Sequence, residues 1–451
     1  MEEPKIAVIG AGLAGLTAAH RIHQAGLKVD VFEASNRVGG RVFSIWMKNY
    51  CGDLTVFELG AQNITDGGDA THFLKLASEF SLEIQSKEIQ LNGSIYYNKK
   101  YVDFKDCLNK HLQNYNNFFE YIDQISQEVK SIGYLIDKAF LSNPALKQAL
   151  LSRMRAYEGI DAYQQSIYHN IDTLIAMLQG GIAKAHQAYE HSPNSLVLSG
   201  VVGGNARLII KMADILKDNL YVNEPIVKIE STQNKVNITF KEGISKSYDF
   251  VVLTAPASTY KNIDLLGAGI EQEKLSLMQQ IGYGQNYKVA LPIDLSTLRH
   301  YTSIITDSSV SFFNHDETVA LLYISSNIKN ISNIEKICRK GLNLPPGNLC
   351  AKLETAKNQL YETYTTPVMH SWFDDIYALG SCSGYSITLS EDLDKKSYQE
   401  GIEYKKLFEP IQGKLFFAGE HTTILDCIGT MEAAVESGER TAKAILKTIH
   451  Q

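Results

Sequence analysis

The chain has 451 residues, of which 44% are hydrophobic and 21% are charged. That length and ordinary globular composition can supply two sizeable cores, so we expect two domains. The formal net charge of -7 comes without a basic block and gives no reason to expect nucleic-acid binding. No apolar run reaches the roughly 20 residues of a membrane span. A strand pattern directly follows the first four residues, so we expect no cleaved signal peptide either.

Cysteine usage bears on the cellular compartment. The cysteines lack C-x-x-C spacing, which argues against a zinc site or a disulfide framework. It favours a reduced, cytoplasmic protein without a bound metal. They stand at Cys51, Cys107, Cys338, Cys350, Cys382 and Cys427.

The N-terminal residues have the pattern of a nucleotide-binding β-α-β unit. Residues 5–9 form an apolar run of strand length, a helix is expected up to about Gly26, and 29–32 have the pattern of a second strand. Between the first strand and the helix lies a G-x-G-x-x-G motif. Its first glycine makes the turn, its second admits a pyrophosphate, and its third lets the helix pack closely. Phosphates would lie at the helix N-terminus, where free N–H groups favour negative charge. The motif consists of Gly10, Gly12 and Gly15.

Glu33 follows the second strand, about 20 residues beyond the glycines, where a carboxylate binds the ribose of a dinucleotide. This unit alone does not separate NAD from FAD. Residues 36–41, Asn-Arg-Val-Gly-Gly-Arg, resemble the R-x-G-G-R signature of the flavin amine oxidase, protoporphyrinogen oxidase and phytoene desaturase superfamily, which favours FAD. Arg41 would offer the second phosphate a bidentate fork. By the same resemblance, Gly60 and Ala61 would lie beside the isoalloxazine ring.

A short helix is expected at 71–80, and a hairpin at 84–97 that turns at Asn92-Gly93. From about 103 to 191 the apolar spacing is helical, which predicts an all-helical insertion forming one wall of a substrate domain. Its aromatic residues are interpreted mainly as core: Tyr115, Phe118, Phe119, Tyr134, Tyr157 and Tyr163.

Residues 201–216 lead back to the first domain. Gly203-Gly204 before an amphipathic helix resembles the G-G-x-x-x-L element of the family. A single strand is expected at 221–229, and the resemblance implies that the backbone of Ile226 or Val227 binds adenine. Residues 249–256 have the pattern of a buried parallel strand, which ends in Thr254-Ala-Pro as the matching family strand does.

Residues 276–385 are expected to complete the substrate domain. Alternating runs at 287–293, 301–306, 319–325 and 367–373 predict antiparallel strands under a helical layer. Lys288 stands where amine oxidases have a lysine that holds a water against flavin N5. The alternative is a strand lysine whose stem lies on apolar surface.

Trp372 lies in a strand similar to the family's tryptophan-containing strand, before a glycine-rich turn at 379–385. Cys382 is close to the position where monoamine oxidases bond a cysteine to the flavin. The alternative is a small buried thiol. Ser383 and Thr430 occupy the places of the two tyrosines that frame the amine in monoamine oxidases, and Tyr385 could replace the first of them.

The C-terminal block carries the second strong resemblance. Residues 414–421 and 428–438 are similar to the F-A-G-E-H-T and G-x-M-E-x-A-x-x-S-G signatures of flavin amine oxidases. Glu420 would contact the ribityl or phosphate region. The N-terminus of the last helix, at Thr430 and Met431, would direct positive charge at the flavin N1-C2=O edge.

Together these features predict an α/β fold. It has a discontinuous, Rossmann-like FAD-binding domain (1–80, 200–275 and 386–451) and an α+β substrate domain (81–199 and 276–385) with an antiparallel sheet. The predicted cofactor-binding residues are Gly10, Gly12, Ala14, Gly15, Glu33, Ala34, Arg37, Gly40, Arg41, Gly60, Ala61, Gln62, Ile226, Val227, Thr254, Gly419, Glu420, Thr430 and Met431.

The resemblance implies a flavin amine oxidase that oxidises an amine or amino acid to the imine, with oxygen as electron acceptor and hydrogen peroxide as product. Lys288 is the one predicted catalytic residue, and Trp372, Ser383 and Tyr385 are predicted to line the substrate site. Two alternatives stay open: a desaturase or dehydrogenase of the same superfamily, and an FAD-bearing binding protein without catalysis. A homodimer is left open. An amino acid would need an arginine for its carboxylate, for which the candidates are Arg153, Arg155 and Arg207.

Overall fold

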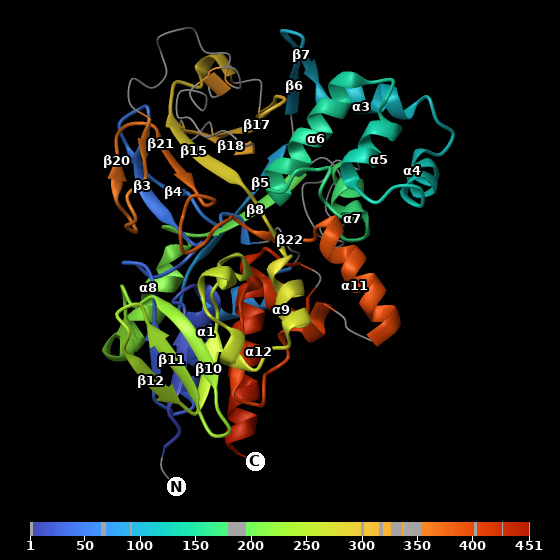
Figure 1. The fold of residues 1–451 in the computed structure, drawn as a ribbon. Helices are drawn as coiled ribbons and strands as arrows, with labels where there is room; N and C mark the ends of the chain where they lie inside the picture. The colour runs from blue at the N-terminus through green and yellow to red at the C-terminus, as the bar shows by residue number, and fades with distance from the viewer. Residues whose placement is uncertain are drawn as a thin grey trace.

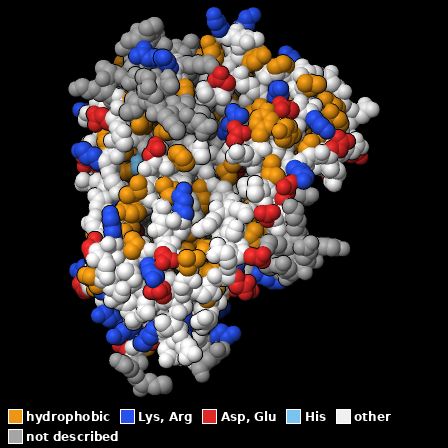
Figure 2. Space-filling model, viewed as in Figure 1, with side chains coloured by type: hydrophobic (Ala, Val, Ile, Leu, Met, Phe, Trp, Pro, Cys, Tyr) orange, Lys and Arg blue, Asp and Glu red, His pale blue; other side chains and the backbone are white. Residues whose placement is uncertain are grey.

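The structure is a computed structural model. Within the ranges that it describes, every helix is too short or too polar to span a lipid bilayer. On the face drawn in Figure 2, Lys and Arg side chains are interspersed with Asp and Glu. The described residues are 3–64, 69–90, 93–178, 195–298, 302–314, 319–325, 336, 337, 339, 342, 353–400, 404–425 and 427–450.

A five-stranded parallel sheet forms the core of the half of the molecule that contains both termini (Figure 1). In spatial order its strands are β23 (Leu415–Phe417), β13 (Phe250–Leu253), β1 (Ile6–Ile9), β2 (Val29–Phe32) and β9 (Leu220–Tyr221). The central strand β1 is fully buried, and it pairs with β2 through Ile6 and Val29 and with β13 through Ile6 and Phe250. Such an apolar run is typical of a parallel sheet covered on both faces.

Helices cover this sheet and bring the two ends of the chain together. They include α1 (Leu13–Gln24), α2 (Thr71–Glu79), α8 (Ala206–Leu216) and α12 (Met431–Ile449). Helices α1 and α12 pack against each other. Their close approach depends on Gly438, because a Cβ there would lie 2.5 Å from the main-chain oxygen of Ala14.

The prediction of a single strand at 221–229 is wrong. The chain forms β9 and then, in a different sheet, β10 (Ile226–Ser231), which pairs with β11 (Val236–Phe240), itself paired with β12 (Ser245–Tyr248). The break has a backbone cause: Asn223 has a φ of 59°, and Pro225 cannot donate to a ladder. The β10–β11 register also skips Val227, between Ile226 and Lys228.

The other half of the molecule is built on an eight-stranded sheet (Figure 1). Its pairs are antiparallel except β19–β21 and β16–β6. All four predicted runs contain a strand, although residue 301 lies outside the described residues, and β17 was not predicted. In spatial order the strands are β19 (Glu354–Thr355), β21 (Val368–Ser371), β15 (Asn286–Pro292), β18 (Val319–Ser325), β17 (Ser309–Asn314), β16 (Ser303–Ile305), β6 (Gly93–Tyr97) and β7 (Lys100–Asp103).

The hairpin predicted at 84–97 is also wrong. Strand β5 (Ile84–Gln90) pairs with β8 (Ser195–Val201), whereas β6 pairs with β7 and β16. The local hairpin is β6–β7, and its turn residues Asn98 and Lys99 have φ values of 48° and 61°. Two consecutive positive φ values are typical of the two-residue turns that match the twist of a hairpin. The hairpin turn therefore lies at Asn98 and Lys99 and not at the predicted Asn92-Gly93, of which Asn92 is outside the described residues.

The predicted helical insertion is present in its described part, and 179–191 lie outside that part. Its helices begin at polar caps; Asp103, Asn117, Ser131 and Asn143 each accept a hydrogen bond from a main-chain N–H of the first turn. The apolar faces form one core with Ile305 and Val310 of the sheet. The helices are α3 (Phe104–Leu112), α4 (Phe118–Ser126), α5 (Ile132–Ala139), α6 (Pro144–Glu158) and α7 (Ile167–Leu178).

Smaller elements join the two halves. The sheet of β20 (Thr363–Tyr364), β3 (Ser44–Lys48) and β4 (Leu54–Glu58) packs on the eight-stranded sheet in a shared core that includes Phe43 and Leu321. Strand β14 (Gly282–Tyr283) pairs with β22 (Ser383–Gly384). Helices α9 (Gln272–Gln279) and α11 (Ile387–Glu400) complete the fold.

Candidate functional site

One cavity of about 1590 Å³ runs through the described part of the chain, from the glycine turn after β1 to the strands β17 and β18. Every residue predicted to bind the cofactor lines it, and so do Lys288, Trp372 and Cys382. Its size exceeds the roughly 300–1,000 Å³ of ordinary small-ligand pockets, as an extended dinucleotide together with a substrate requires.

Two glycines of the turn after β1 are required by protein packing, whereas the third faces open space in the cavity. A Cβ on Gly15 would lie 2.0 Å from the main-chain oxygen of Gly10, and one on Gly10 would lie 2.4 Å from Thr254 Oγ1. Both glycines are therefore required by packing. A Cβ on Gly12 would meet nothing within 4 Å, although Gly12 lines the cavity. Gly12 also precedes α1 without a side-chain cap, so the first N–H groups of that helix can serve an anion.

Glu33 lies at the end of β2 and holds the glycine turn in place. Its carboxylate accepts hydrogen bonds from Ala11 N (2.8 Å) and Ser35 N (2.9 Å). The side chain is buried yet lines the cavity beside Ala34. A carboxylate has about four acceptor positions, so Glu33 can also bind ribose hydroxyls.

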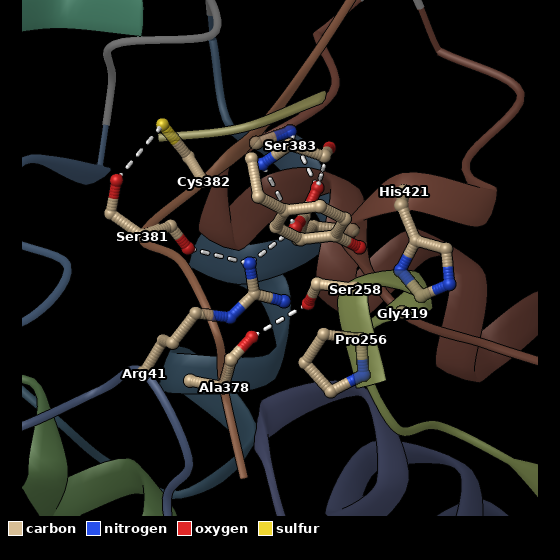
Figure 3. A network of polar contacts seen from close by, with 12 residues as sticks. Arg41, Pro256, Ser258, Ala378, Ser381, Cys382, Ser383, Gly419 and His421 are labelled. Carbon is tan, nitrogen blue, oxygen red and sulfur yellow. Dashed lines mark hydrogen bonds and ion pairs between the residues drawn. The ribbon is translucent and has the colours of Figure 1, made fainter. Parts of the chain in front are cut away.

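Arg41 and Glu420 form a buried ion pair in the middle of the cavity wall. Arg41 Nη1 donates to the main-chain oxygen of Ser381 (2.7 Å), as Figure 3 shows. It also donates to Glu420 Oε1 (2.5 Å). Glu420 also accepts from Gly429 N (2.8 Å) and from Ser383 Oγ. Burial raises the pKa of the Glu420 carboxyl, but Arg41, the adjacent His421 and the Ser383 hydrogen bond outweigh burial and leave the pKa below its ordinary value. The pair is therefore charged at neutral pH.

Arg37 lines the same cavity, and His421 follows Glu420 in the chain. Arg37 Nε donates to Asn358 Oδ1, and the guanidinium lies 4.4 Å from the ring centroid of Phe43. His421 is fully buried. Burial and the nearby Arg41 charge lower its pKa to about 4, against an opposing effect of Glu420. His421 is therefore neutral at pH 7.

Lys288 reaches from β15 to the segment that follows β4. Its Nζ donates to the main-chain oxygens of Gly60 (2.7 Å) and Glu58 (3.1 Å) and to Gln62 Oε1 (3.2 Å). It also lies 4.9 Å from the ring centroid of Tyr323. Three acceptors and an aromatic face suit an ammonium group, so the geometry favours the protonated form.

Glu58 stands at the start of the same segment. Its carboxylate accepts from Asn205 N (2.7 Å) and from Ser44 Oγ (2.8 and 2.9 Å). Burial raises the pKa of this carboxyl to about 7, although both donors and the charge of Lys288 lower it. Asn205 Nδ2 in turn donates to the main-chain oxygens of Ala61 and Gln62. Glu58 and Asn205 thus fix the backbone that receives Lys288, and sequence reasoning did not single out either residue.

Two of the residues predicted to line the substrate site lie elsewhere. Ser383 is fully buried and donates to Glu420, and Tyr385 packs against Tyr404 with ring centroids 5.0 Å apart. Neither lines the cavity. Trp372 does, and its Nε1 donates to the main-chain oxygen of Leu59 (3.0 Å). Cys382 Sγ lies 3.7 Å from the main-chain oxygen of Glu158, at the end of α6.

The cavity is also lined by aromatic residues that sequence reasoning assigned to the core or passed over, among them Tyr157, Phe312 and Tyr323. The position of Tyr323 depends on strand register, because it lies opposite Lys288 in the β15–β18 pair. No local sequence pattern contains that information.

Fold and cavity together define an α/β protein in which one cavity extends from the glycine turn of the parallel sheet to strands β17 and β18 of the eight-stranded sheet. A family model described as flavin-containing amine oxidoreductase matches residues 13–446, and the chain belongs to that family. Members of the family are FAD-dependent oxidoreductases whose substrates are amines and amino acids.

Individual relatives are distant. The chain is 23% identical to a rat flavin-containing amine oxidase B over 98% of its own length and 86% of the relative's. It is 21% identical to an L-amino-acid oxidase of Vipera ammodytes ammodytes over 99% and 93%. It is 24% identical to a rice relative named lysine-specific histone demethylase 1 homolog 2, of which it spans 57%. Cyclohexylamine oxidase from Brevibacterium oxydans has the same fold, with a TM-score of 0.72, 15% identity and 100% of both chains covered.

Proposed function

We propose that the chain is an FAD-dependent amine oxidase that converts a primary or secondary amine to the imine, which water then hydrolyses to a carbonyl product. The observation that carries this proposal is the continuity of one cavity between Gly12 and Lys288. Bound FAD would accept the hydride equivalents of the amine α C–H and pass them to molecular oxygen, with release of hydrogen peroxide.

The residues fit such a dinucleotide along its length. The open Gly12 and the N-terminus of α1 suit the pyrophosphate, and Glu33 suits the ribose. Val227, which the β10–β11 ladder skips, suits the adenine. At the other end, Gly60 lines the cavity without bulk, and the N-terminus of α12 directs its positive end at the cavity through Met431.

The distribution of positive charge supports an amine rather than an amino acid. Arg153, Arg155 and Arg207, the arginines that could hold a carboxylate, do not line the cavity. Arg153 lies over Phe104, Arg155 pairs with Asp161, and Arg207 donates to Val202. Among the described residues the basic side chains that do line the cavity are Arg37, Arg41, Lys241 and Lys288.

Lys288 would act by position. Its protons are committed to Gly60, Glu58 and Gln62, so it holds this segment beside the cavity. Giving up one of the two longer hydrogen bonds would let it bind a water, as its family counterpart does. No side-chain base is needed for hydride removal from a neutral amine.

Peroxide release from the FAD-loaded protein tests the proposal. The panel comprises alkylamines, polyamines and amino acids, and we expect peroxide with alkylamines. A protein that binds FAD but releases no peroxide with any of them, while dehydrogenating an alkene precursor, would be a desaturase. A protein that binds FAD, but whose flavin is reduced neither by the amines and amino acids nor by the alkene precursor, would be a binding protein.

Further parts of the proposal concern the setting. We propose that the enzyme is cytoplasmic, because its scattered cysteines fit a reduced protein. We also propose that the chain divides into the FAD-binding and substrate domains whose bounds are given above. The contact of Cys382 Sγ with the Glu158 carbonyl supports a thiol that packs on protein. Acid precipitation tests this: the yellow colour should stay in solution, and colour in the pellet would show a covalent flavin.

A further inference from the structure

The two positions that carry framing tyrosines in monoamine oxidases have structural roles in this chain. Ser383 donates to Glu420, and Thr430 caps α12 by accepting from Ala433 N (3.1 Å) while donating to the Cys427 carbonyl (2.7 Å). Neither offers an aromatic face to the cavity. On the Lys288 side the cavity is lined instead by an aromatic seat, which consists of Tyr157, Phe312 and Tyr323.

Within this seat, Tyr323 is held beside Lys288. The two residues are paired in the β15–β18 register, so both side chains project from the same face of the sheet. The Tyr323 hydroxyl donates to Gln62 Oε1 (3.2 Å), the atom that also accepts from Lys288 Nζ. A phenol that donates to a fixed acceptor can still accept from a ligand N–H, and Tyr323 is only partly buried.

The wall around Tyr323 is apolar. Phe312 meets it edge to face, with ring centroids 5.9 Å apart, and Val319 and Leu321 precede it on the same face of β18. Among the described residues, the carboxylates that line the cavity are Glu33, Glu58, Glu224, Asp375 and Glu420, none of which lies on α6 or on β15, β17 or β18. A substrate with a second ammonium group would therefore find no described cavity-lining carboxylate in that wall.

We propose that Tyr323 is a specificity-determining residue: its hydroxyl accepts an N–H of the substrate amine, and the apolar wall selects a substituent without a second charge. The inference rests on the proposed function and narrows it to apolar monoamines. The amine seat is then formed by the end of α6 with β17 and β18, in place of the two positions at Ser383 and Thr430.

A matched pair of substrates tests the apolar wall in the FAD-loaded enzyme. Hexylamine and hexamethylenediamine have the same chain, but only the second carries a distal ammonium. We expect kcat/KM to favour hexylamine by about tenfold or more. The distal ammonium of the diamine would leave water for the apolar wall and lose at least one hydrogen-bonding partner there. Phe312→Asp supplies a counter-charge and should move the ratio toward the diamine by about tenfold. A wild-type preference for the diamine, or an unchanged ratio in the variant with native melting temperature and flavin absorbance, would overturn the proposal.

Equilibrium binding tests Tyr323 without turnover. tert-Octylamine has no α hydrogen, so calorimetry on the FAD-loaded protein measures its binding alone. Tyr323→Phe keeps the ring and should raise its Kd about three- to tenfold. Tyr96→Phe, on the same sheet but outside the cavity lining, should leave it unchanged. Equal Kd values in both variants would refute the role of the hydroxyl. Binding that depends on Tyr323 without oxidation of any amine would refute the proposed function and leave the seat standing.

Discussion

The glycine turn and the aromatic seat lie on one cavity but are specified in different ways. The turn and the residues around it, from Gly10 to Arg41, are close in sequence, although Gly10 also packs on Thr254 and Arg41 pairs with Glu420. The seat combines the end of α6 with β17 and β18, so its geometry depends on strand register and helix packing. We therefore expect the glycine turn to tolerate little change, whereas substitutions in the aromatic seat should change specificity before they unfold the protein.

Breaking the Arg41–Glu420 pair should have the largest effect. Arg41→Met leaves a buried carboxylate without its cation, which should lower the free energy of unfolding by roughly 3 kcal/mol at pH 7. The pKa of Glu420 is depressed in the folded state, so its contribution is present above the ordinary carboxyl pKa and is lost as pH falls through the folded value. Urea unfolding should thus show the difference between wild type and variant shrinking in acid.

The control for that experiment is Lys138→Met, which removes an exposed pair with Glu128 and should leave stability almost unchanged. Equal losses in both variants would mean that the central ion pair is no more important than a surface one.

Substitutions in the glycine turn should be next in size. Gly15→Ala places a Cβ 2.0 Å from the Gly10 carbonyl and should destabilise by about 2–3 kcal/mol, measured by thermal unfolding of the apo-protein. Gly12→Ala meets no protein atom and should leave apo-protein stability unchanged while weakening FAD binding. Equal FAD affinity in Gly12→Ala and wild type would place the pyrophosphate elsewhere.

Lys288 sharpens the comparison from the substrate side. Lys288→Met should slow flavin reduction by an amine about 100-fold while FAD still binds, because the residue lies beside the reacting end of the cavity. Rapid mixing without oxygen measures this rate. Lys246→Met is the matched control, since Lys246 lies over an aromatic ring, that of Phe32, in the cofactor half. A slow Lys246→Met enzyme, or a fast Lys288→Met enzyme, would contradict the assignment.

The smallest expected effect is a pH dependence at Glu58. The pKa of Glu58 in the folded protein, about 7, is above the ordinary carboxyl value, so the folded state favours the protonated carboxyl. The folded protein therefore loses stability as pH rises from the ordinary carboxyl pKa to the folded one. Glu58→Gln removes that ionisation and keeps an acceptor for Ser44. Wild type should therefore become less stable relative to the variant from pH 5 to pH 8 in urea unfolding. Parallel pH profiles would assign the ionisation to another group.

The same contrast explains what could be predicted from sequence. The first β-α-β unit, the buried strand at 250–253 and the last helix follow from local patterns, and the structure contains them. The hairpin at 84–97 failed because a strong turn signal does not reveal that β5 pairs with β8, more than a hundred residues away. The strand at 221–229 failed because apolar composition masked the positive φ of Asn223.

The site divides in the same way. The residues predicted to bind the cofactor line the cavity, and they could be recognised in the sequence because glycines and caps act through their own backbone. Tyr323 was passed over because its place in the cavity comes from its pairing with Lys288. Ser383 and Tyr385 were expected at the substrate by position in a turn, yet Ser383, in β22, donates to Glu420, and Tyr385, directly after β22, packs against Tyr404. Side-chain direction in such a short strand depends on its partner, here β14.

The most direct test of the central claim is a spectroscopic experiment on the purified protein with FAD and hexylamine in the absence of oxygen. The account predicts that one FAD binds per chain, that hexylamine bleaches its yellow absorbance, and that admitting oxygen restores the colour with release of peroxide. A protein that stays colourless with FAD, or a yellow protein that no amine bleaches, would contradict it.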